Sequence, residues 1–529
     1  MSFLLADLLS AAAEQNPAAT ALVHRERELS YGELAARVEA AAQGFLALGM
    51  GRAERIGIYL DKRFETVIAI FAAAAAGCAF VPINPLLKAR QVGHILRDCH
   101  IRLLVTSADR RRGLVEELEQ APELRHVVQV DGQPASGQIN SITAWDGLLA
   151  LGRGAKRAPH RVIDQDMTAI LYTSGSTGMP KGVVLSHRNL VAGAASVSSY
   201  LGHRAEDRIL AVLPLSFDAG LSQITTAFRA GASVVLLDYL LPQDVIKAIA
   251  AHRVTGMTGV PPLWNQLADV EWPEAARQSL RYFANTGGHM PRTTLARLRA
   301  LLPRAEPFLM YGLTESFRST YLPPAEVDRR PDSIGKAIPN AEILLVGDDG
   351  RVCGPGEQGE LVHRGALVAL GYWNDPVRTA ERFRPAPGRN PGLRLPEIAV
   401  WSGDTVRMDD EGFLYFVGRR DDMIKTSGYR VSPTEIEEAV YASQGVGEAV
   451  AVGVPYDRLG QAIVVVATPP RGGRIEREAL IAHCRRQLPA FMVPLDIVER
   501  AQLPRNANGK IDRKALAQEL AVMFLEPVS

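Results

Sequence analysis

Short apolar segments rich in β-branched residues alternate with helical patterns through the first half of the chain. Between residues 21 and 240 these segments include RIGIYL, AFVPIN, RLLVTS, TAILYTS and RILAVLP. Strands that alternate with helices form βαβ units, so this order predicts a parallel sheet with helices on its faces. The helix expected after Ser30 fits the pattern, because Ser30 and Glu33 can form a capping box at its start and Gly49 lies near its end.

The pattern changes in the second half of the chain. Residues 341–372 contain short strand-like segments separated by Gly, Asp and Pro, which predicts a small antiparallel or barrel-like subdomain. Beyond residue 420, a capped helix beginning near Ser432 and the strand-like segments AVAVGVP and AIVVVATPP indicate a new unit. Two domains are also expected from size, since 529 residues exceed what one hydrophobic core usually supports.

We therefore predict an α/β fold in two parts. Residues 1–420 are expected to form a large N-terminal domain of stacked αβα layers plus a small β-barrel-like subdomain. Residues 421–529 are expected to form a small, mobile α+β C-terminal domain, and about 110 residues is a normal domain size.

Composition argues against several classes of partner. The 59 basic and 58 acidic side chains nearly cancel, so no broad field is expected that would attract nucleic acid or an anionic membrane. The apolar run at residues 69–81 is too short to cross a bilayer and fits a core helix that leads into a buried strand. The four cysteines lack zinc-site spacing and are expected to be buried apolar residues. The first residues lack the basic leader of a signal peptide, which predicts a cytoplasmic location, while the oligomeric state stays open.

The segment LYTSGSTGMPKG, residues 171–182, follows an apolar strand and is rich in glycine and hydroxyl groups. Glycines allow the backbone to approach a ligand closely, hydroxyls can bind phosphate oxygens, and a lysine adds a positive charge. The predicted phosphate-binding residues are Thr173, Ser174, Gly175, Ser176, Thr177, Gly178 and Lys181. A Walker A loop would need Ser or Thr after the lysine, where Gly182 stands, and the remaining alternative is a flexible surface turn.

Five motifs together resemble the adenylate-forming superfamily, which includes acyl-CoA synthetases, the adenylation domains of nonribosomal peptide synthetases, and luciferases. They are TSGSTGMPKG, YGLTE, WSGD, GRRDDMIKTSGYR and NANGKIDR, in the order that this superfamily uses, and the resemblance extends nearly end to end. It implies an ATP-dependent, AMP-forming ligase that converts a small carboxylic acid to its acyl-adenylate. The acyl group would then pass to a thiol, either coenzyme A or the phosphopantetheine of an acyl or peptidyl carrier protein.

The resemblance also implies roles for the nucleotide-site residues. Tyr311 would stack on adenine, Thr314 would contact the α-phosphate, and Glu315 would bind Mg²⁺, with Gly287 and Gly288 along the nucleotide and Asp404 and Arg419 on the ribose. A single carboxylate suits Mg²⁺, which takes its other ligands from water and ATP phosphates. The structural alternatives are a helix cap at residues 314–315, a turn at Asp404 and a surface ion pair at Arg419.

By the same resemblance, Lys510 would neutralise the negative charge that builds up in the first chemical step. The C-terminal domain would then rotate about Asp421 and bring in residues 425–430, among them Lys425 and Gly428, for thiol transfer. Read without the other motifs, Lys510 would be an ordinary exposed lysine and Asp421 a solvated loop residue. A luciferase-like oxygenase, a stand-alone amino-acid-adenylating domain and a non-catalytic nucleotide-binding regulator are the competing functions.

The acid pocket is less constrained by sequence. The segment LPLSFDAGLSQ, residues 213–223, places Phe217 and Asp218 where similar amino-acid-activating domains pair an aspartate with the substrate ammonium, and Ser222 follows. The other pocket residues that the resemblance implies are Gly259, Thr286, Arg318 and Ser319.

Arg318 leaves three readings open. Facing the pocket, it would require a second acidic or strongly polar group on the substrate, and facing outward it would form a surface pair. Asp218 could instead be its partner. Together with residues 80–99 (FVPINPLLKARQVGHILRDC), the Asp218 segment is also similar to AMP-forming ligases associated with exosortase systems, which points to a carrier protein as acceptor.

Overall fold

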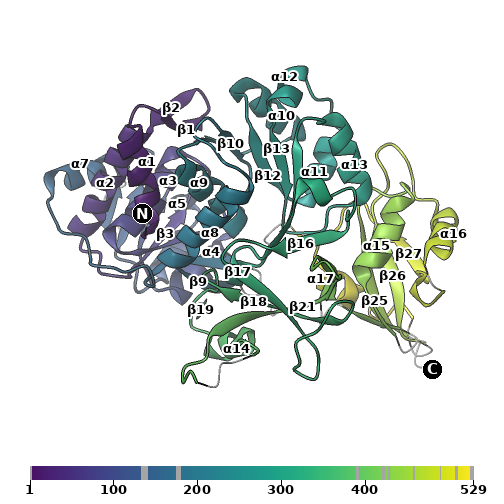
Figure 1. Ribbon diagram of the computed structural model, residues 1–529. Helices are drawn as coiled ribbons and strands as arrows, with labels where there is room; N and C mark the ends of the chain where they lie inside the picture. The colour runs from purple at the N-terminus through teal and green to yellow at the C-terminus, as the bar shows by residue number, and fades with distance from the viewer. Residues whose placement is uncertain are drawn as a thin grey trace.

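The computed structural model describes most of the chain. The described residues are 3–132, 141–173, 180–388, 392–419, 423–426, 429–456, 459–488, 490–506 and 510–524. They form two sheets in the N-terminal part of the chain and a third sheet in the C-terminal part (Figure 1).

The first sheet has eight strands in the order β19-β9-β8-β4-β3-β5-β6-β7. The strands are β3 (Arg55–Tyr59), β4 (Ala79–Pro82), β5 (Ile101–Thr106), β6 (His126–Gln129), β7 (Ser141–Ala144), β8 (Met167–Thr173), β9 (Lys181–Ser186) and β19 (Gly371–Tyr372). Strands β3 to β8 pair in parallel, and β9 and β19 add antiparallel pairs at one edge. The parallel sheet predicted from the alternating pattern is therefore confirmed.

The second sheet joins the two halves of the N-terminal part. Its parallel section holds β1 (Thr20–His24), β11 (Ser233–Leu236), β10 (Arg208–Ala211), β12 (Gly256–Gly259), β13 (Tyr282–Asn285) and β14 (Glu306–Tyr311), with β2 (Arg27–Ser30) antiparallel at the edge. Its antiparallel section holds β15 (Thr320–Leu322), β16 (Ser333–Ala337), β22 (Leu414–Arg419), β21 (Ile398–Met408), β18 (Gln358–Gly365) and β17 (Ala341–Val346), with β20 (Phe383–Pro385) on β21. The antiparallel prediction holds, but these described strands continue an open sheet and do not close into a barrel.

Helices form layers on both faces of the two sheets. The helices between the sheets are α1 (Leu5–Gln15), α3 (Phe64–Ala76), α8 (His187–Tyr200) and α9 (Asp218–Ala230), and the largest core cluster joins them to both sheets. The outer layers are α4 (Ala89–Asp98) on one side and α10 (Pro242–His252), α11 (Pro261–Ala268) and α13 (Arg292–Leu301) on the other. The predicted stack of αβα layers is thus observed.

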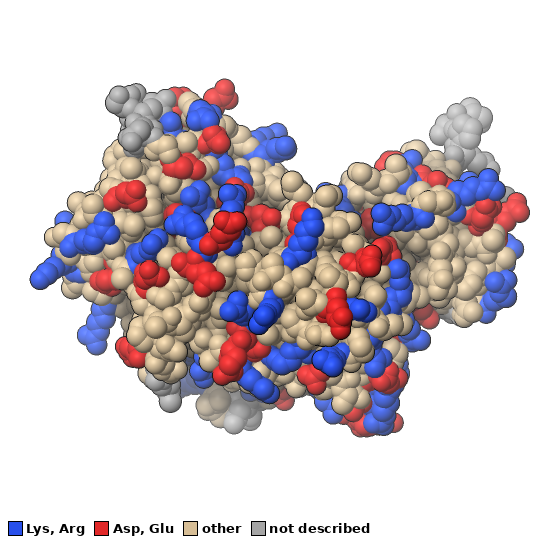
Figure 2. Space-filling model, turned by 90° about the horizontal axis from the view of Figure 1, so that it is seen from above, with Lys and Arg blue, Asp and Glu red and all other residues tan. Residues whose placement is uncertain are grey.

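Three local expectations are confirmed as well. Helix α2 (Tyr31–Ala47) begins with the Ser30–Glu33 capping box. The apolar run at residues 69–81 is the buried part of α3 followed by β4, and the four cysteines are buried and unpaired. No helix among the described residues is long and apolar enough to span a membrane. Figure 2 shows basic and acidic side chains interspersed on the face that it presents, as expected from the nearly balanced charge.

The C-terminal part has its own sheet and core. Strands β23 (Ile424–Thr426), β24 (Tyr429–Val431), β25 (Ala449–Tyr456), β26 (Gly460–Ala467) and β27 (Asp496–Glu499) pack with α15 (Pro433–Ala442), α16 (Arg477–Gln487) and α17 (Arg513–Glu519). Its two core clusters contain only residues from Ile424 onward. It contacts the larger part through α15, where Ser432 donates to the Val417 carbonyl and Glu438 contacts His289. The predicted boundary at residue 420 lies outside the described residues.

The contact between α2 and α7 (Trp145–Gly154) depends on glycine. A Cβ on Gly152 would lie 1.8 Å from the Ala40 carbonyl oxygen, whereas a Cβ on Gly154 would meet no atom within 4 Å. We expect Gly152→Ala to lower the free energy of unfolding by about 1–3 kcal/mol or more, because the backbones must separate. Gly154→Ala should be neutral or stabilising. Urea denaturation of both variants tests this, and equal effects would contradict the close packing.

Candidate active site

The predicted site residues converge at the carboxyl ends of the parallel strands β12, β13 and β14. In parallel α/β sheets this edge is where ligands usually bind, because the loops that leave it are free to carry polar groups. Thr286 follows β13, Tyr311 ends β14, and Thr314 and Glu315 lie in the short 3₁₀ turn η1 (Thr314–Ser316) that comes next. Asp218 begins α9 and faces the same edge, since its Oδ1 accepts a hydrogen bond from the Thr314 hydroxyl at 3.4 Å.

A three-residue cluster lies on the side of the site next to the phosphate loop. Lys181, the first residue of β9, donates from Nζ to Glu315 Oε1 at 3.1 Å and to the Tyr372 hydroxyl at 2.7 Å. Tyr372 donates to the same Glu315 oxygen at 2.5 Å. Strand pairing explains the meeting, because β19 carries Tyr372 alongside β9.

The electrostatics of this cluster keep Glu315 ionised. Burial of Glu315 opposes its charge, but Lys181, the Tyr372 hydroxyl and Arg382 outweigh burial and lower the pKa of Glu315 to about 2. Burial lowers the pKa of Lys181, and Glu315 opposes that shift. At neutral pH Glu315 is therefore a carboxylate, as a magnesium ligand must be.

Sequence reasoning gave no role to Tyr372 or Arg382. Arg382 ends α14 (Pro376–Arg382), donates to the Trp401 carbonyl at 2.9 Å, and acts electrostatically on Glu315. The only local signal is the helix start at Asp375 and Pro376, which is a capping pattern and says nothing about ligands. The two residues reach the site through the pairing of β19 with β9, which a single sequence does not reveal.

Asp404 forms a second cluster with Tyr311 and Arg419. The Tyr311 hydroxyl donates to Asp404 Oδ2 at 2.5 Å and Arg419 Nε to Oδ1 at 3.0 Å. Asp404 and Arg419 are register partners across β21 and β22, so the contact is built into the sheet. Burial raises the pKa of Asp404, and Arg419 and Tyr311 oppose that shift. These three residues were all predicted for the nucleoside side of ATP, and that assignment stays a prediction.

Lys510 approaches the same site from the C-terminal part of the chain. The Asn506 N–H donates to the Lys510 carbonyl and the Lys510 N–H donates to Asn506 Oδ1, next to an antiparallel bridge between Arg505 and Ile511. Solvent reaches the Lys510 side chain, yet the surrounding protein and Arg419 lower its pKa, while the carboxylates of Asp218, Asp404 and Glu315 oppose that shift. The structure therefore brings Lys510 within electrostatic reach of Asp218, Glu315 and Asp404, although the lysine is at least 106 residues away from each in the sequence.

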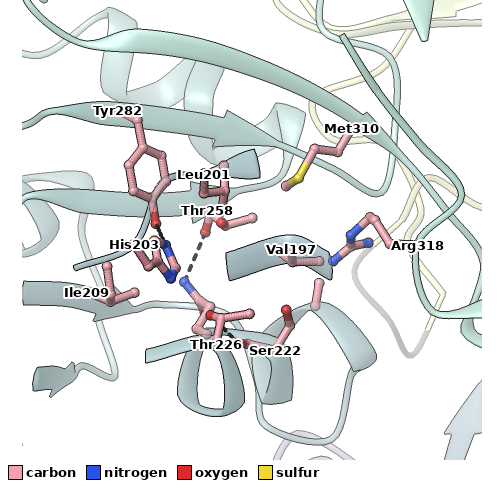
Figure 3. Close-up of a pocket in the computed structure, with 12 residues that line it drawn as sticks. Val197, Leu201, His203, Ile209, Ser222, Thr226, Thr258, Tyr282, Met310 and Arg318 are labelled. Atoms are coloured by element: carbon pink, nitrogen blue, oxygen red, sulfur yellow. Dashed lines mark hydrogen bonds between the residues drawn. The ribbon is translucent and has the colours of Figure 1, made fainter. Parts of the chain in front are cut away.

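The position of Arg318 shows whether its side chain faces outward or toward the predicted acid pocket. Its side chain is 3% exposed, donates to the Thr286 hydroxyl at 2.9 Å, and has a nitrogen 3.5 Å from Asp218 Oδ2. Arg318 therefore does not face outward. It lines a small cavity, and Figure 3 shows its guanidinium directed into that cavity.

The other predicted pocket residues differ in orientation. Ser222 lines the cavity, and Phe217 is the residue before α9. Position 259 faces away from the cavity, since a Cβ added to Gly259 would meet the Trp264 ring. Thr258 lines the cavity instead. The Ser319 hydroxyl forms hydrogen bonds with the Ser316 hydroxyl and with His363 Nδ1. Gly287 has a φ of 76°, which glycine adopts without strain, and Gly288 lies against Pro261.

Several predicted residues cannot be placed. Ser174, Gly175, Ser176, Thr177, Gly178, Asp421 and Gly428 lie outside the described residues, and only the backbone of Lys425, in β23, is described. Thr173 ends β8, and its hydroxyl makes no hydrogen bond to the described part of the chain.

Comparison with known proteins agrees with this geometry. The family described as AMP-binding enzyme matches residues 9–373, and the AMP-binding enzyme C-terminal domain matches residues 435–510. An L-proline–[L-prolyl-carrier protein] ligase of Streptomyces coelicolor is 34% identical over 504 residues, which cover 92% of this chain and 91% of that protein. Other relatives are much longer, such as tyrocidine synthase 3 of Brevibacillus parabrevis, of which this chain spans 7%.

Two solved structures share the whole fold. The anthranilate CoA ligase AuaEII in complex with anthranoyl-AMP superposes with a TM-score of 0.87 at 25% identity, covering 98% of each chain. The O-succinylbenzoate coenzyme A synthetase MenE of Bacillus subtilis, in complex with ATP and a magnesium ion, superposes with a TM-score of 0.80 at 26% identity, covering 96% of this chain and 98% of that one.

The chain belongs to the AMP-binding enzyme family. The predictions of an adenylate-forming enzyme and of an ATP-dependent ligase are confirmed. The expectation of Mg²⁺ agrees with the ion that accompanies ATP in the MenE structure.

Tyr372 offers a test of the phosphate-side cluster. Since a hydrogen bond to a charged group contributes about 1.5–3 kcal/mol, Tyr372→Phe should raise the KM for MgATP about tenfold or more. Tyr415→Phe is the matched control, because its hydroxyl also binds a carboxylate, Asp409, at 3.0 Å but lies outside the cluster. Steady-state kinetics against ATP compare the two variants. Equal KM values in both would contradict a role for Tyr372 in the nucleotide site.

Proposed function

We propose that this protein activates a small carboxylic acid as its acyl-adenylate and transfers the acyl group to the phosphopantetheine thiol of a carrier protein. The observation that carries the first step is the convergence of Lys510, Glu315 and Lys181 on one edge of the sheet. The assignment of a carrier protein draws on the name of the Streptomyces ligase, and coenzyme A, the acceptor named in the solved relatives, is the second candidate.

The first step joins two negatively charged reactants. An oxygen of the acid attacks the α-phosphorus of ATP, the bond from that phosphorus to the bridging oxygen of pyrophosphate breaks, and acyl-AMP and pyrophosphate result. The reaction needs positive charge between the carboxylate and the phosphates, because charge accumulates on the oxygens around phosphorus. Lys510 is placed to supply it, close enough to Asp218 and Glu315 to interact with both electrostatically.

The residues present fit magnesium. Glu315 offers one ionised carboxylate, which is a normal protein contribution to a Mg²⁺ ion that binds mainly water and phosphate oxygens. Bound there, the ion would neutralise phosphate charge. Lys181 and Arg382 would add two cations for the β- and γ-phosphates, and Asp404 would accept hydrogen bonds from the ribose hydroxyls.

The second step requires a different arrangement. The thiol loses its proton and attacks the acyl carbon, the bond to the phosphate oxygen breaks, and AMP leaves. In this structure Lys510 lies close enough to Asp218, Asp404 and Glu315 to interact with them electrostatically, and in this proposal the C-terminal part turns before a pantetheine arm enters. Between the two parts, α15 contacts α13 and β22, Ser432 donates to the Val417 carbonyl, and Glu438 contacts His289, so these are contacts that the turn would break.

Lys510→Ala tests the proposed first step. We expect acid-dependent exchange of pyrophosphate into ATP to fall by about 10²-fold to 10³-fold, because the cation that offsets the developing charge is lost. Lys514→Ala, at the second residue of α17 and four residues further along the chain, is the matched control and should retain exchange.

Transfer from chemically synthesised acyl-AMP to the thiol separates this role from a folding defect. Lys510→Ala should keep this second half-reaction, since Lys510 acts only in adenylation. Loss of both half-reactions, or of neither, would contradict the assignment. A regulator without catalysis would show no exchange in the unmodified protein with any acid.

A further inference from the structure

The charged guanidinium of Arg318 is buried beside the cavity next to the predicted acid site. Arg318 is 2% exposed as a residue and lies at the rim of a cavity whose other lining residues include Val197, Ser222 and Met310. Figure 3 shows the guanidinium directed toward Val197 across the cavity. A buried arginine retains its charge, so it requires acceptors nearby.

The acceptors around Arg318 satisfy it only in part. One nitrogen donates to Thr286 at 2.9 Å, and the same nitrogen lies 3.5 Å from Asp218 Oδ2, which is longer than a charge-assisted hydrogen bond. The Nε atom is buried and has no hydrogen-bond partner in the described part of the chain. The Tyr200 hydroxyl also interacts with this guanidinium. A guanidinium has five N–H donors, and with Nε unpartnered in the described part of the chain, capacity for a further acceptor remains.

Asp218 lies nearer the reacting end of the pocket. Its other oxygen contacts the Thr314 hydroxyl, and its charge acts on Lys510. Its side chain is 15% exposed, against 3% for Arg318. A chain of contacts therefore leads from Thr314 to Asp218 and from Asp218 to Arg318, which lines the cavity.

The space beyond Arg318 is short. The cavity has a volume of about 10 Å³, enough for about one water molecule. His203 and Tyr282 line its far end, where His203 Nε2 and the Tyr282 hydroxyl form a hydrogen bond of 2.8 Å. A long acyl or aryl chain has no room beside these side chains.

We infer that the acid is a short amino acid whose side chain ends in a carboxylate or carboxamide, with its ammonium on Asp218 and its side-chain oxygen on Arg318. This inference rests on the proposed function, because it assumes that the α-carboxylate is the group activated at Lys510. Such a substrate gives Asp218 a cationic donor and Arg318 an acceptor. A side-chain carboxylate also leaves the four charges balanced, whereas a carboxamide supplies the acceptor without a compensating charge. A dicarboxylate without an ammonium would add uncompensated negative charge beside Asp218, and an apolar side chain would leave Arg318 as poorly satisfied as before.

The test compares substrates that differ in one group. Acid-dependent pyrophosphate exchange is measured with L-aspartate, L-asparagine, L-glutamate and L-glutamine. Succinate is the control that lacks the ammonium of aspartate, and L-2-aminobutyrate is the control that lacks its side-chain oxygens. At least one of the four should exceed its controls in kcat/KM by about 10²-fold or more, because a site built for a polar group discriminates strongly against analogues lacking it.

Variants of Asp218 and Arg318 then show whether these residues cause the difference in kcat/KM between the substrates. Arg318→Met should reduce kcat/KM for the preferred substrate by about 10²-fold. The ratio of that kcat/KM to the kcat/KM for L-2-aminobutyrate should therefore fall. Arg318→Lys should restore part of the loss. If Arg318→Met alone does not fold, the double variant D218N/R318M removes both charges together, and its melting temperature and substrate preference are measured instead.

The outcomes separate this inference from the proposed function. A highest kcat/KM for an apolar amino acid, an aryl acid or an acid without an ammonium would overturn the inference while leaving adenylation intact. The same holds if Arg318→Met, or the double variant, leaves the ratio of aspartate-type to aminobutyrate-type substrates unchanged. Absence of exchange with every acid of a broad panel would instead contradict the proposed function.

Discussion

The attraction between one lysine and three distant carboxylates is the interaction on which the site depends. Lys510 belongs to the C-terminal part, while Asp218, Glu315 and Asp404 come from α9, η1 and β21. Without a nucleotide these carboxylates would repel one another, and the ammonium of Lys510, with Lys181 and Arg419, balances them. The same positive charges that balance these carboxylates are those that a triphosphate and an acid require.

The fold explains why these groups can meet and separate. Parallel strands end at one edge, which gathers the loops after β12, β13 and β14 over a rigid sheet with helices on both faces. The C-terminal part has its own core, so it can move as a unit while the strand-end residues stay fixed. In the proposed function the larger part keeps the site residues in place, and the change between the two half-reactions would come from movement of the smaller part.

Contiguous motifs made the nucleotide side predictable from sequence. Lys181, Tyr311, Glu315, Asp404 and Lys510 each lie in a short segment whose residue types are unusual for packing, and the structure brings them to one place. The alternation of strands and helices predicted the layers for a similar reason, since hydrophobic period is local information.

Contacts between distant segments could not be predicted in this way. Tyr372 reaches Glu315 because β19 pairs with β9, more than 180 residues earlier in the chain. Whether Arg318 faces outward was also open, and only its burial, with a side chain that is 3% exposed, excludes that reading. Gly259 was expected in the pocket, but alternation along β12 turns Thr258 to the cavity and leaves Gly259 against Trp264. The barrel-like subdomain failed to close because its strands extend the large sheet.

The most direct test of attack by the acid on the α-phosphorus of ATP traces the oxygen atoms of the acid into the products. The acid that best supports exchange is prepared with ¹⁸O in its carboxylate and converted fully in the presence of ATP, Mg²⁺ and thiol acceptor, and the products are analysed by mass spectrometry. Attack on the α-phosphorus predicts that each AMP formed carries one ¹⁸O and that pyrophosphate carries none. Label in pyrophosphate or orthophosphate, or AMP without label, would show that the acid does not capture the innermost phosphorus.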